Sequence, residues 1–481
     1  MRKLLETTAE YAIPYLEGLD ARNVAPTQEA IANLIQFDEP LPNKPVDAEL
    51  VLQQLDEIGS PASMAQAGSR FFGFVTGGSL PAALAANWLA AAWDQNCGMY
   101  RITPATALLE QVALRWLLDV LHLPADCGGA FVTGATVANF TALAAARHAV
   151  LEREGWNVEA DGLFGAPPIT VAVSEEAHPS LLKSLGLLGL GRSRVVKVPV
   201  DGQGRMRPDA IPTLNRPAII CTQMGNVNTG ACDPVGEICD HAKEVGAWVH
   251  VDGAFGLWAA AAPSLAHLTA GMEEADSWAT DAHKWLNVPY DSGLTFVRHT
   301  QALQAAMAIT AEYLPTVSDQ RNPSDYTPEL SRRARGVEVW AALRSLGRSG
   351  LADLIERTCR HARHFAQELK AAGYPILNDV VLNQVLVSFG DADPTRRLAC
   401  ASTRRCRTEN GSAPYGASVC PRYHHAELEA PSTHGSRCCG LSRSHPCGDS
   451  GVRSRVYEDP DRPNSLKSGT SNCAKCSASH G

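Results

Sequence analysis

Short apolar runs rich in β-branched residues alternate with helical patterns between Gly129 and about Arg298, and this alternation restricts the possible folds strongly. Strands that alternate with helices are typical of a mostly parallel sheet with helices on both faces, so we predict an α/β fold. Ligands of such sheets bind at the carboxyl ends of the strands. The expected strands are Ala130–Val132, Ile169–Val173, Val195–Val198, Ala218–Cys221, Ala247–Val251 and Leu294–Val297.

Small residues follow the first expected strand. The segment Gly134–Asn139 lies between this strand and a helix that is expected from about Ala138. Small side chains let the backbone approach an anion, and a helix N-terminus offers free N–H groups and the positive end of the helix dipole. Thr136 adds a hydroxyl. The segment is therefore a candidate anion site, and an ordinary tight turn between strand and helix is the alternative.

Asp252 and His178 follow two further expected strands. A carboxylate beside an apolar strand is poorly solvated and favours a cationic partner, such as a protonated pyridine nitrogen. A helix N-cap or a structural ion pair is the alternative for Asp252. The imidazole of His178 can stack on the face of an aromatic ring, and a cap of the following helix is the alternative there.

Lys284 lies between His283 and Trp285, 32 residues after Asp252. A lysine among apolar groups and cations loses its proton more readily, and its neutral amine can attack an aldehyde. The alternative is a surface lysine whose stem covers Trp285. Four strand ends thus carry, in order, an anion cradle, a histidine, an aspartate and a lysine. This combination is more informative than any of its members.

Over about residues 60–390 the sequence resembles the group II amino-acid decarboxylases, which depend on pyridoxal 5'-phosphate (PLP) and include glutamate and aromatic amino-acid decarboxylases. The resemblance implies a type I PLP-dependent (aspartate aminotransferase-like) fold, with a mostly parallel seven-stranded sheet in the large domain and a small C-terminal domain. It also implies a homodimer with active sites at the interface. The motifs are Arg70–Phe74, Thr103–Thr106, Glu110, Trp116, Leu123-Pro124, Gly134–Asn139, His178–Ser180, Gly225–Gly230, Asp233-Pro234, His250–Asp252, Asp281–Trp285 and Ser331–Arg335.

The resemblance also implies roles for individual residues. Lys284 matches the lysine that binds PLP as a Schiff base, Asp252 the partner of the ring nitrogen, and His178 the histidine that stacks on the ring. Asn226 stands where relatives often have Thr near the cofactor hydroxyl, so its role is open, and Thr76 is a candidate for the substrate pocket. The other implied cofactor residues are Gly134, Ala135, Thr136 and His283 around the phosphate, Asp281 close by, and Ala254 against the ring.

The reaction expected from this resemblance is decarboxylation of an L-amino acid to its amine and CO2. A loop tyrosine is implicated in returning a proton to Cα in relatives, and Tyr326 or Tyr313 could serve here. The catalytic candidates are therefore Lys284, His178, Asp252 and Tyr326. Another PLP-dependent lyase or an aminotransferase of the same fold is an alternative, and so is a catalytically impaired homologue that still binds PLP.

The chain divides by pattern into five expected regions. Residues 1–60 form a helical arm with a Pro-rich break, and residues 61–300 form the PLP-binding domain. Residues 301–330 are expected to be an irregular, mobile active-site loop. Residues 331–397 begin the small domain. The elements expected there are a helix that carries Arg332, Arg333 and Arg335, a second helix to about Gly373, and a strand over Val380–Phe389.

The composition changes abruptly after about residue 390. Eight of the fourteen cysteines follow this point, whereas Ile, Phe, Trp and Met are absent from it. Such a segment cannot bury a core, so residues 398–481 are expected to be a disordered tail. We hypothesise a frameshift near residue 398 that truncates the small domain, and a structural zinc site around Cys473 and Cys476 is the rival interpretation.

Bulk properties exclude several classes of partner. The net charge is −9 and the pI is about 5.9, so no basic field attracts nucleic acid or anionic lipid. No apolar run reaches the roughly 20 residues that span a membrane. The N-terminus reaches Glu6 too early for a signal peptide, and the first six cysteines show no paired spacing. A cytoplasmic protein is expected.

Overall fold

The computed structural model describes residues 1–309, 320–389 and 418–419. The chain divides into two compact units, Met1–His424 and His425–Gly481, and all described residues belong to the first. Apart from strand residues 418 and 419, the segment 398–481 lies outside the described residues, and so do the frameshift and zinc hypotheses that concern it.

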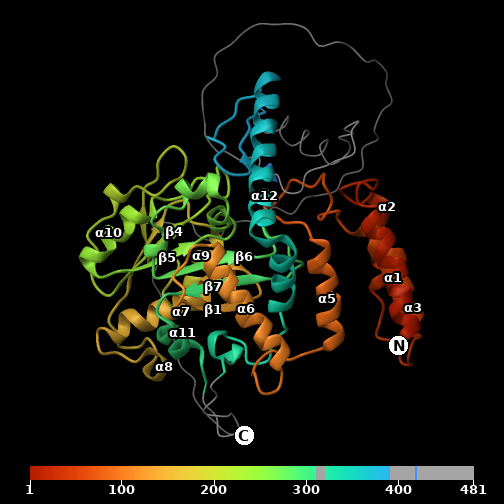
Figure 1. The fold of residues 1–481 in the computed structure, drawn as a ribbon, viewed down its shortest axis with the longest axis horizontal. Helices are drawn as coiled ribbons and strands as arrows, with labels where there is room; N and C mark the ends of the chain where they lie inside the picture. Colours follow the sequence, from red (N-terminus) through yellow and green to blue (C-terminus); the bar gives the residue numbers. More distant parts are fainter. Residues whose placement is uncertain (310–319, 390–417, 420–481) are drawn as a thin grey trace, which may run out of the picture. The chain divides into compact units, whose positions relative to one another are not determined.

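A seven-stranded sheet forms the centre of the first unit, with the strand order β1-β7-β6-β5-β4-β2-β3 (Figure 1). Strand β7 runs antiparallel to both of its neighbours, and the other adjacent pairs are parallel. The predicted mostly parallel α/β sheet is therefore confirmed. The strands are β1 Gly128–Val132, β2 Thr170–Ser174, β3 Val196–Val198, β4 Ala218–Gln223, β5 Trp248–Asp252, β6 Ser277–Asp281 and β7 Gly293–Val297.

Strand β6 was not predicted, because Ser277–Asp281 contains only one large apolar residue. Every residue of this strand is buried, since β5 and β7 flank it and the helix Ala135–Glu152 packs on it. Neighbouring elements supply the burial that the strand's own composition does not indicate.

Two hydrophobic cores cover the two faces of the sheet. One contains Val249 and Val251 of β5 and packs against helices α6 and α10, whereas the other contains Trp248 and packs against α7, α9 and α11. This division follows from the period of two in a strand. The helices are α6 Pro104–Val120, α7 Ala135–Glu152, α8 Val158–Asp161, α9 Pro179–Leu187, α10 Val235–Val245 and α11 Thr300–Met307.

Helix α7 begins at Ala135, three residues before the predicted start. The N–H of Ala135 donates to Oδ1 of Asp281 at 2.6 Å, so a side chain from the end of β6 caps the helix. Because this capping group is distant in the sequence, the local pattern did not reveal it.

The N-terminal region is helical, as expected. Helix α1 spans Arg2–Glu17 and buries none of its residues, and the segment 34–47 that contains the Pro-rich break separates α2 from α3. The other elements before α6 are α2 Gln28–Asn33, η1 Leu34–Phe37, α3 Ala48–Gln54, η2 Leu55–Gly59, α4 Ser60–Ala62 and α5 Pro81–Trp93.

Three predictions for residues after 298 were wrong. The segment expected to be irregular contains α11, whose Ala302 and Leu303 are buried against α7, and the short helix η7 Pro323–Tyr326. The arginines of 332–335 precede a helix instead of lying in one, because α12 begins at Gly336. The strand expected over 380–389 is reduced to β8 Gln384–Val385, which pairs with β9 Ser418–Val419.

Helix α12 spans Gly336–Ala371 and bends at Gly347, whose φ of 61° favours glycine (Figure 1). The remaining short helices are η3 Pro208–Ala210, η4 Gly256–Ala261, η5 Pro263–Leu268 and η6 Met272–Glu274. Within the described part of the chain, no helix is both long and apolar enough to span a membrane.

Candidate active site at the carboxyl edge of the sheet

The ends of five strands meet at one edge of the sheet, because β1, β2, β4, β5 and β6 all run in the same direction. A cavity of about 60 Å³ lies there, and His178, Asp252 and Lys284 line it together. Three residues that the sequence singled out at separate positions along the chain thus share one cavity. The other lining residues are Phe74, Val75, Gln223, Gly225, Val227, Ala254 and Phe255.

Lys284 lies three residues beyond the end of β6. Its Nζ is 3.1 Å from Oδ2 of Asp281, and Nε2 of His283 is 3.5 Å from the same oxygen. Burial alone would raise the pKa of the Asp281 carboxyl, but the hydrogen bond from His283 and the charge of Lys284 hold it below its ordinary value. Asp281 is therefore an anion that orients the lysine.

The N-terminus of α7 lies beside this group. Gly134 precedes the helix, and a Cβ at that position would lie 3.2 Å from Cε1 of His283. Small residues thus let the helix start approach His283 and Asp281 closely. Ala135 is buried and Thr136 is half-buried, and the N–H of Ala135 is already bonded to Asp281.

Asp252 is the last residue of β5 and is only 4% exposed. Its Oδ2 accepts a hydrogen bond from Nδ2 of Asn139 at 3.0 Å, and its Oδ1 accepts one from the N–H of Ala254 at 3.3 Å. Burial raises the pKa of the carboxyl, while the charge of Lys284 and the bond from Asn139 oppose this shift. A cation in the cavity would favour the ionised form.

His178 caps helix α9, as the alternative interpretation of this residue predicted. Its Nδ1 accepts a hydrogen bond from the N–H of Ser180 at 3.2 Å and lies 2.7 Å from the Ser180 hydroxyl. The ring lines the cavity as well. Burial lowers the pKa of His178, so the imidazole is held toward its neutral form.

Several predicted residues lie outside the lining of this cavity, namely Gly134, Ala135, Thr136, Asn226, Asp281, His283 and Tyr326. Asn226 organises the turn after β4, because its Nδ2 donates to Glu176 at 2.9 Å and its Oδ1 accepts from the N–H of Asn228. The hydroxyl of Tyr326 accepts a hydrogen bond from Gln304 at 3.1 Å. Tyr313 falls outside the described residues.

A second cavity of about 20 Å³ adjoins the first and shares Val75, Phe255 and Lys284 with it. Thr76, the predicted pocket residue, lines this second cavity. The close approach here depends on Gly77, because a Cβ at that position would lie 2.0 Å from the carbonyl oxygen of Lys284.

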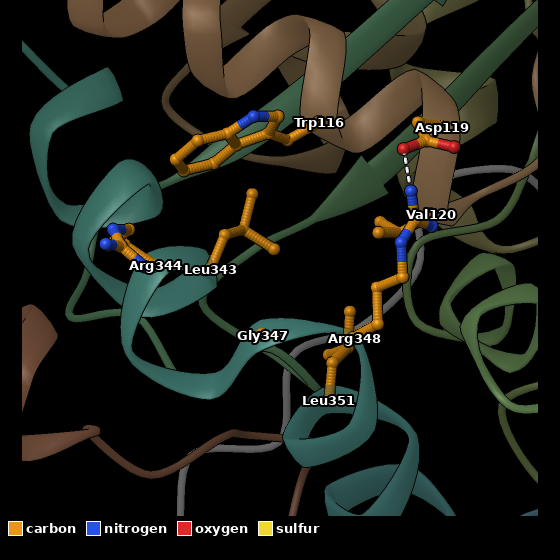
Figure 2. A pocket seen from close by; sticks show the side chains of 8 residues that line it. All are labelled: Trp116, Asp119, Val120, Leu343, Arg344, Gly347, Arg348 and Leu351. Carbon is orange, nitrogen blue, oxygen red and sulfur yellow. Dashed lines mark hydrogen bonds and ion pairs between the residues drawn. The ribbon is translucent and has the colours of Figure 1, made fainter.

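A larger cavity of about 260 Å³ lies elsewhere, between α6 and α12. Figure 2 shows Trp116 above Leu343, with Asp119 bonded to Arg348 at the rim. Arg344 lines the cavity as well, and none of the residues at the carboxyl edge of the sheet does. Size alone therefore does not identify the reactive site.

Sequence reasoning missed the partners behind Asp252. The segment Gly134–Asn139 was interpreted as an anion cradle or a tight turn, but its last residue bonds the carboxylate. The period of two in β5 places His250 and Asp252 on one face, and this signal could have suggested that the two act together.

Comparison with known proteins extends this description. Residues 32–389 match the family model for the pyridoxal-dependent decarboxylase conserved domain. The chain is 28% identical to L-tyrosine/L-DOPA decarboxylase 2 of Lophophora williamsii, over 70% of this chain and 67% of that protein. It is 29% identical to L-2,4-diaminobutyrate decarboxylase of Rhizobium meliloti (strain 1021), over 76% and 75% of the two chains.

Solved structures show the same fold. The crystal structure of mouse CSAD aligns with a TM-score of 0.76 at 23% identity, covering 83% of this chain and 87% of that one. That of Oryza sativa TDC with PLP and tryptamine aligns with a TM-score of 0.71 at 24% identity, covering 78% and 80%. The predicted fold is confirmed by these similarities.

Proposed function

Because the chain belongs to the family of pyridoxal-dependent decarboxylases, we propose that it removes the α-carboxylate of an L-amino acid as CO2, with PLP held as a Schiff base by Lys284. Family membership makes it a PLP-dependent carboxy-lyase. The observation that carries the finer proposal is that Lys284, Asp252 and His178 line one cavity.

The donor set of this cavity fits PLP. A buried carboxylate suits a protonated ring nitrogen, and a lysine amine suits an aldehyde. We propose that Gly134, Ala135, Thr136 and His283 hold the phosphate, since a helix N-terminus and a histidine favour an anion. Ala254 lines the cavity beside Asp252 and would contact the ring.

Each side chain then has a distinct task. PLP, when bound, supplies the electron sink for the bond between Cα and the carboxylate. Asp252 keeps the proton on the ring nitrogen, because the two opposite charges stabilise each other away from water. His178, held toward its neutral form, offers an uncharged ring to the cofactor face. Asp281 orients Lys284.

The proton that replaces CO2 on Cα needs a donor. We propose Tyr326 or Tyr313 for this task. Tyr326 is half-buried beside Arg321, whose guanidinium carbon lies 4.1 Å from the centre of the ring. Thr76, on the cavity that shares Lys284, is proposed to contact the substrate.

We also propose a homodimer. Helix α1 buries none of its residues and exposes Leu5, Ile13 and Leu16, which a second copy could cover.

The six cysteines within the described residues are free and buried, which supports a reducing, cytoplasmic environment. Sedimentation equilibrium of the full chain tests the dimer, and fractionation of the source cells tests the location.

Incubation of the full chain and PLP with single amino acids tests the function. Release of CO2 and the matching amine supports a decarboxylase, whereas a keto acid indicates an aminotransferase. Lys284→Ala should abolish the visible absorbance of lysine-bound cofactor as well as CO2 release. A folded wild-type chain that acquires no such absorbance would contradict the proposal, and absorbance without turnover would indicate an impaired homologue.

A further inference from the structure

A chain of hydrogen bonds runs from Asp252 into the interior between the sheet and α7. Asn139 donates from Nδ2 to Asp252, and its Oδ1 lies 2.9 Å from Nε2 of His250. Nδ1 of His250 lies 2.9 Å from the hydroxyl of Ser277. This hydroxyl accepts a hydrogen bond from Nε1 of Trp248 at 2.9 Å. We call these five residues the Asp252 relay.

The relay follows from local structure. Trp248, His250 and Asp252 alternate along β5, so they lie on the face that α7 covers. Ser277 is paired with His250 across β5 and β6, and Asn139 lies on α7. The four members behind Asp252 are fully buried. Each therefore depends on the relay for its hydrogen bonds.

The direction of every bond in the relay can be assigned. An ionised carboxylate only accepts, so Asn139 presents its NH2 to Asp252 and its oxygen to His250. His250 must then carry its proton on Nε2. Burial lowers the pKa of His250 to about 3, so its ring is neutral and Nδ1 accepts from Ser277. All donors thus point toward Asp252.

We propose that Asn139 and His250 are positioning residues that hold Asp252 as an oriented carboxylate for the ring nitrogen of PLP. This inference rests on the proposed function, in which Asp252 pairs with that nitrogen. Burial by itself favours the neutral acid, and a neutral partner forms a weaker hydrogen bond than a charged one. The hydrogen bond from Asn139 opposes this effect. The hydrogen bond with His250 keeps the side-chain amide of Asn139 from flipping, which would exchange its nitrogen and oxygen.

Two ionisable groups face Asp252 from the cavity, Lys284 from the end of β6 and His178 from the start of α9. On the relay side the facing groups are Asn139 and, beyond it, His250. Both Lys284 and His178 stay unchanged in a test that alters only the relay. A shift in the ionisation of Asp252 can then be attributed to the relay.

The test compares the affinity of the cofactor-free full chain for PLP and for an analogue whose ring nitrogen is replaced by carbon. The ratio of the two Kd values, measured by fluorescence titration from pH 6 to 9, reports the bond to Asp252 alone. In Asn139→Leu we expect the preference for PLP to fall about tenfold at pH 7 and to return at higher pH, as Asp252 ionises.

His250→Phe should show the same loss of preference for PLP, because the side-chain amide of Asn139 is then free to flip. This variant replaces Asn139→Leu in the test if that protein does not fold. His250→Gln keeps an N–H for Asn139 and should retain the preference, as should Asn33→Leu on the exposed surface of α2. A merely structural role would weaken binding of both ligands equally and leave the ratio unchanged at every pH, which would overturn the inference. A wild-type chain that does not distinguish the ligands would instead contradict the proposed role of Asp252.

Discussion

The backbone N–H of Ala135 donates a 2.6 Å hydrogen bond to Oδ1 of Asp281, 146 positions further along the chain. The other oxygen of this carboxylate lies 3.1 Å from Nζ of Lys284. One side chain therefore joins the start of α7 to the proposed Schiff-base lysine. It also places a negative charge where the phosphate of PLP is proposed to bind.

Asp281→Asn removes this charge but retains an oxygen that can accept from Ala135. Two anions compete for the same N–H groups, so the substitution should lower the Kd for PLP by about tenfold, or about 1.4 kcal/mol. Titration of the cofactor-free chain measures the change. Asp276→Asn is the control, because Asp276 accepts a backbone N–H from Val249 instead. Unchanged or weaker binding would show that Asp281 does not compete with the phosphate.

Gly77→Ala should displace the backbone of Lys284, since the added Cβ would lie 2.0 Å from its carbonyl oxygen. We expect loss of the visible absorbance of bound cofactor and a free energy of unfolding lower by about 1–3 kcal/mol. Gly202→Ala is the matched control, because no atom lies within 4 Å of the added Cβ. A Gly77→Ala protein with unaltered absorbance and stability would refute this close packing.

Glu110 and Arg332 form a buried ion pair with 2.7 Å between Oε2 and Nη1, and both side chains are 0% exposed. Arg321 lies 3.0 Å from the other carboxylate oxygen. Glu110→Gln removes the buried carboxylate that both cations contact and should lower the free energy of unfolding by about 3–5 kcal/mol. Urea denaturation measures the difference.

Glu6→Gln provides the comparison for this substitution, because the pair of Glu6 with Arg2 is exposed. We expect a change below about 1 kcal/mol there. Similar effects at the two sites would mean that the buried pair contributes no more than a surface pair.

His250 should make the protein sensitive to acid. Burial lowers the pKa of His250 in the folded state to about 3, whereas the pKa of a histidine in the unfolded chain is about 6.5. Below pH 6.5 the unfolded chain therefore binds the extra proton, and stability is lost as the pH falls toward 3, by at most about 1.4 kcal/mol per pH unit. Asp252 is linked to His250 through Asn139.

His250→Gln should flatten this dependence, because glutamine does not titrate. Urea denaturation of the cofactor-free chain at pH 7, 6 and 5 provides the measurement. His364→Gln, at a side chain that is 69% exposed, should leave the dependence as in the wild type. Equal slopes for wild type and His250→Gln would disprove the contribution of His250.

Tyr326 and Tyr313 can be separated by parallel substitution. Tyr326→Phe removes the hydrogen bond to Gln304 and should lower the free energy of unfolding by about 1 kcal/mol. Since Tyr326 does not line either cavity around Lys284, we expect Tyr313→Phe to slow formation of the amine more than Tyr326→Phe does. The reverse order in single-turnover measurements would assign the proton donor to Tyr326.

The sequence by itself determined the α/β class and the ends of the strands that Asp252 and His178 follow, and it singled out Lys284 by its neighbours. Strand patterns are local, and polar residues just after apolar runs mark the ligand edge of a parallel sheet. Strand β6 and helix α11 escaped this reasoning. Their burial comes from neighbours, β5 and β7 in one case and α7 in the other.

Only the tertiary structure decided which side chains meet. The bond from Ala135 to Asp281 and the bonds that Asn139 makes with Asp252 and His250 join residues more than 100 positions apart, and they depend on the placement of α7. The bond between His250 and Ser277 depends on the register of β5 against β6. A one-residue shift in that register would move Ser277 to the other face of the sheet. Local sequence patterns carry no information about such a shift, so these contacts had to be found in the folded chain.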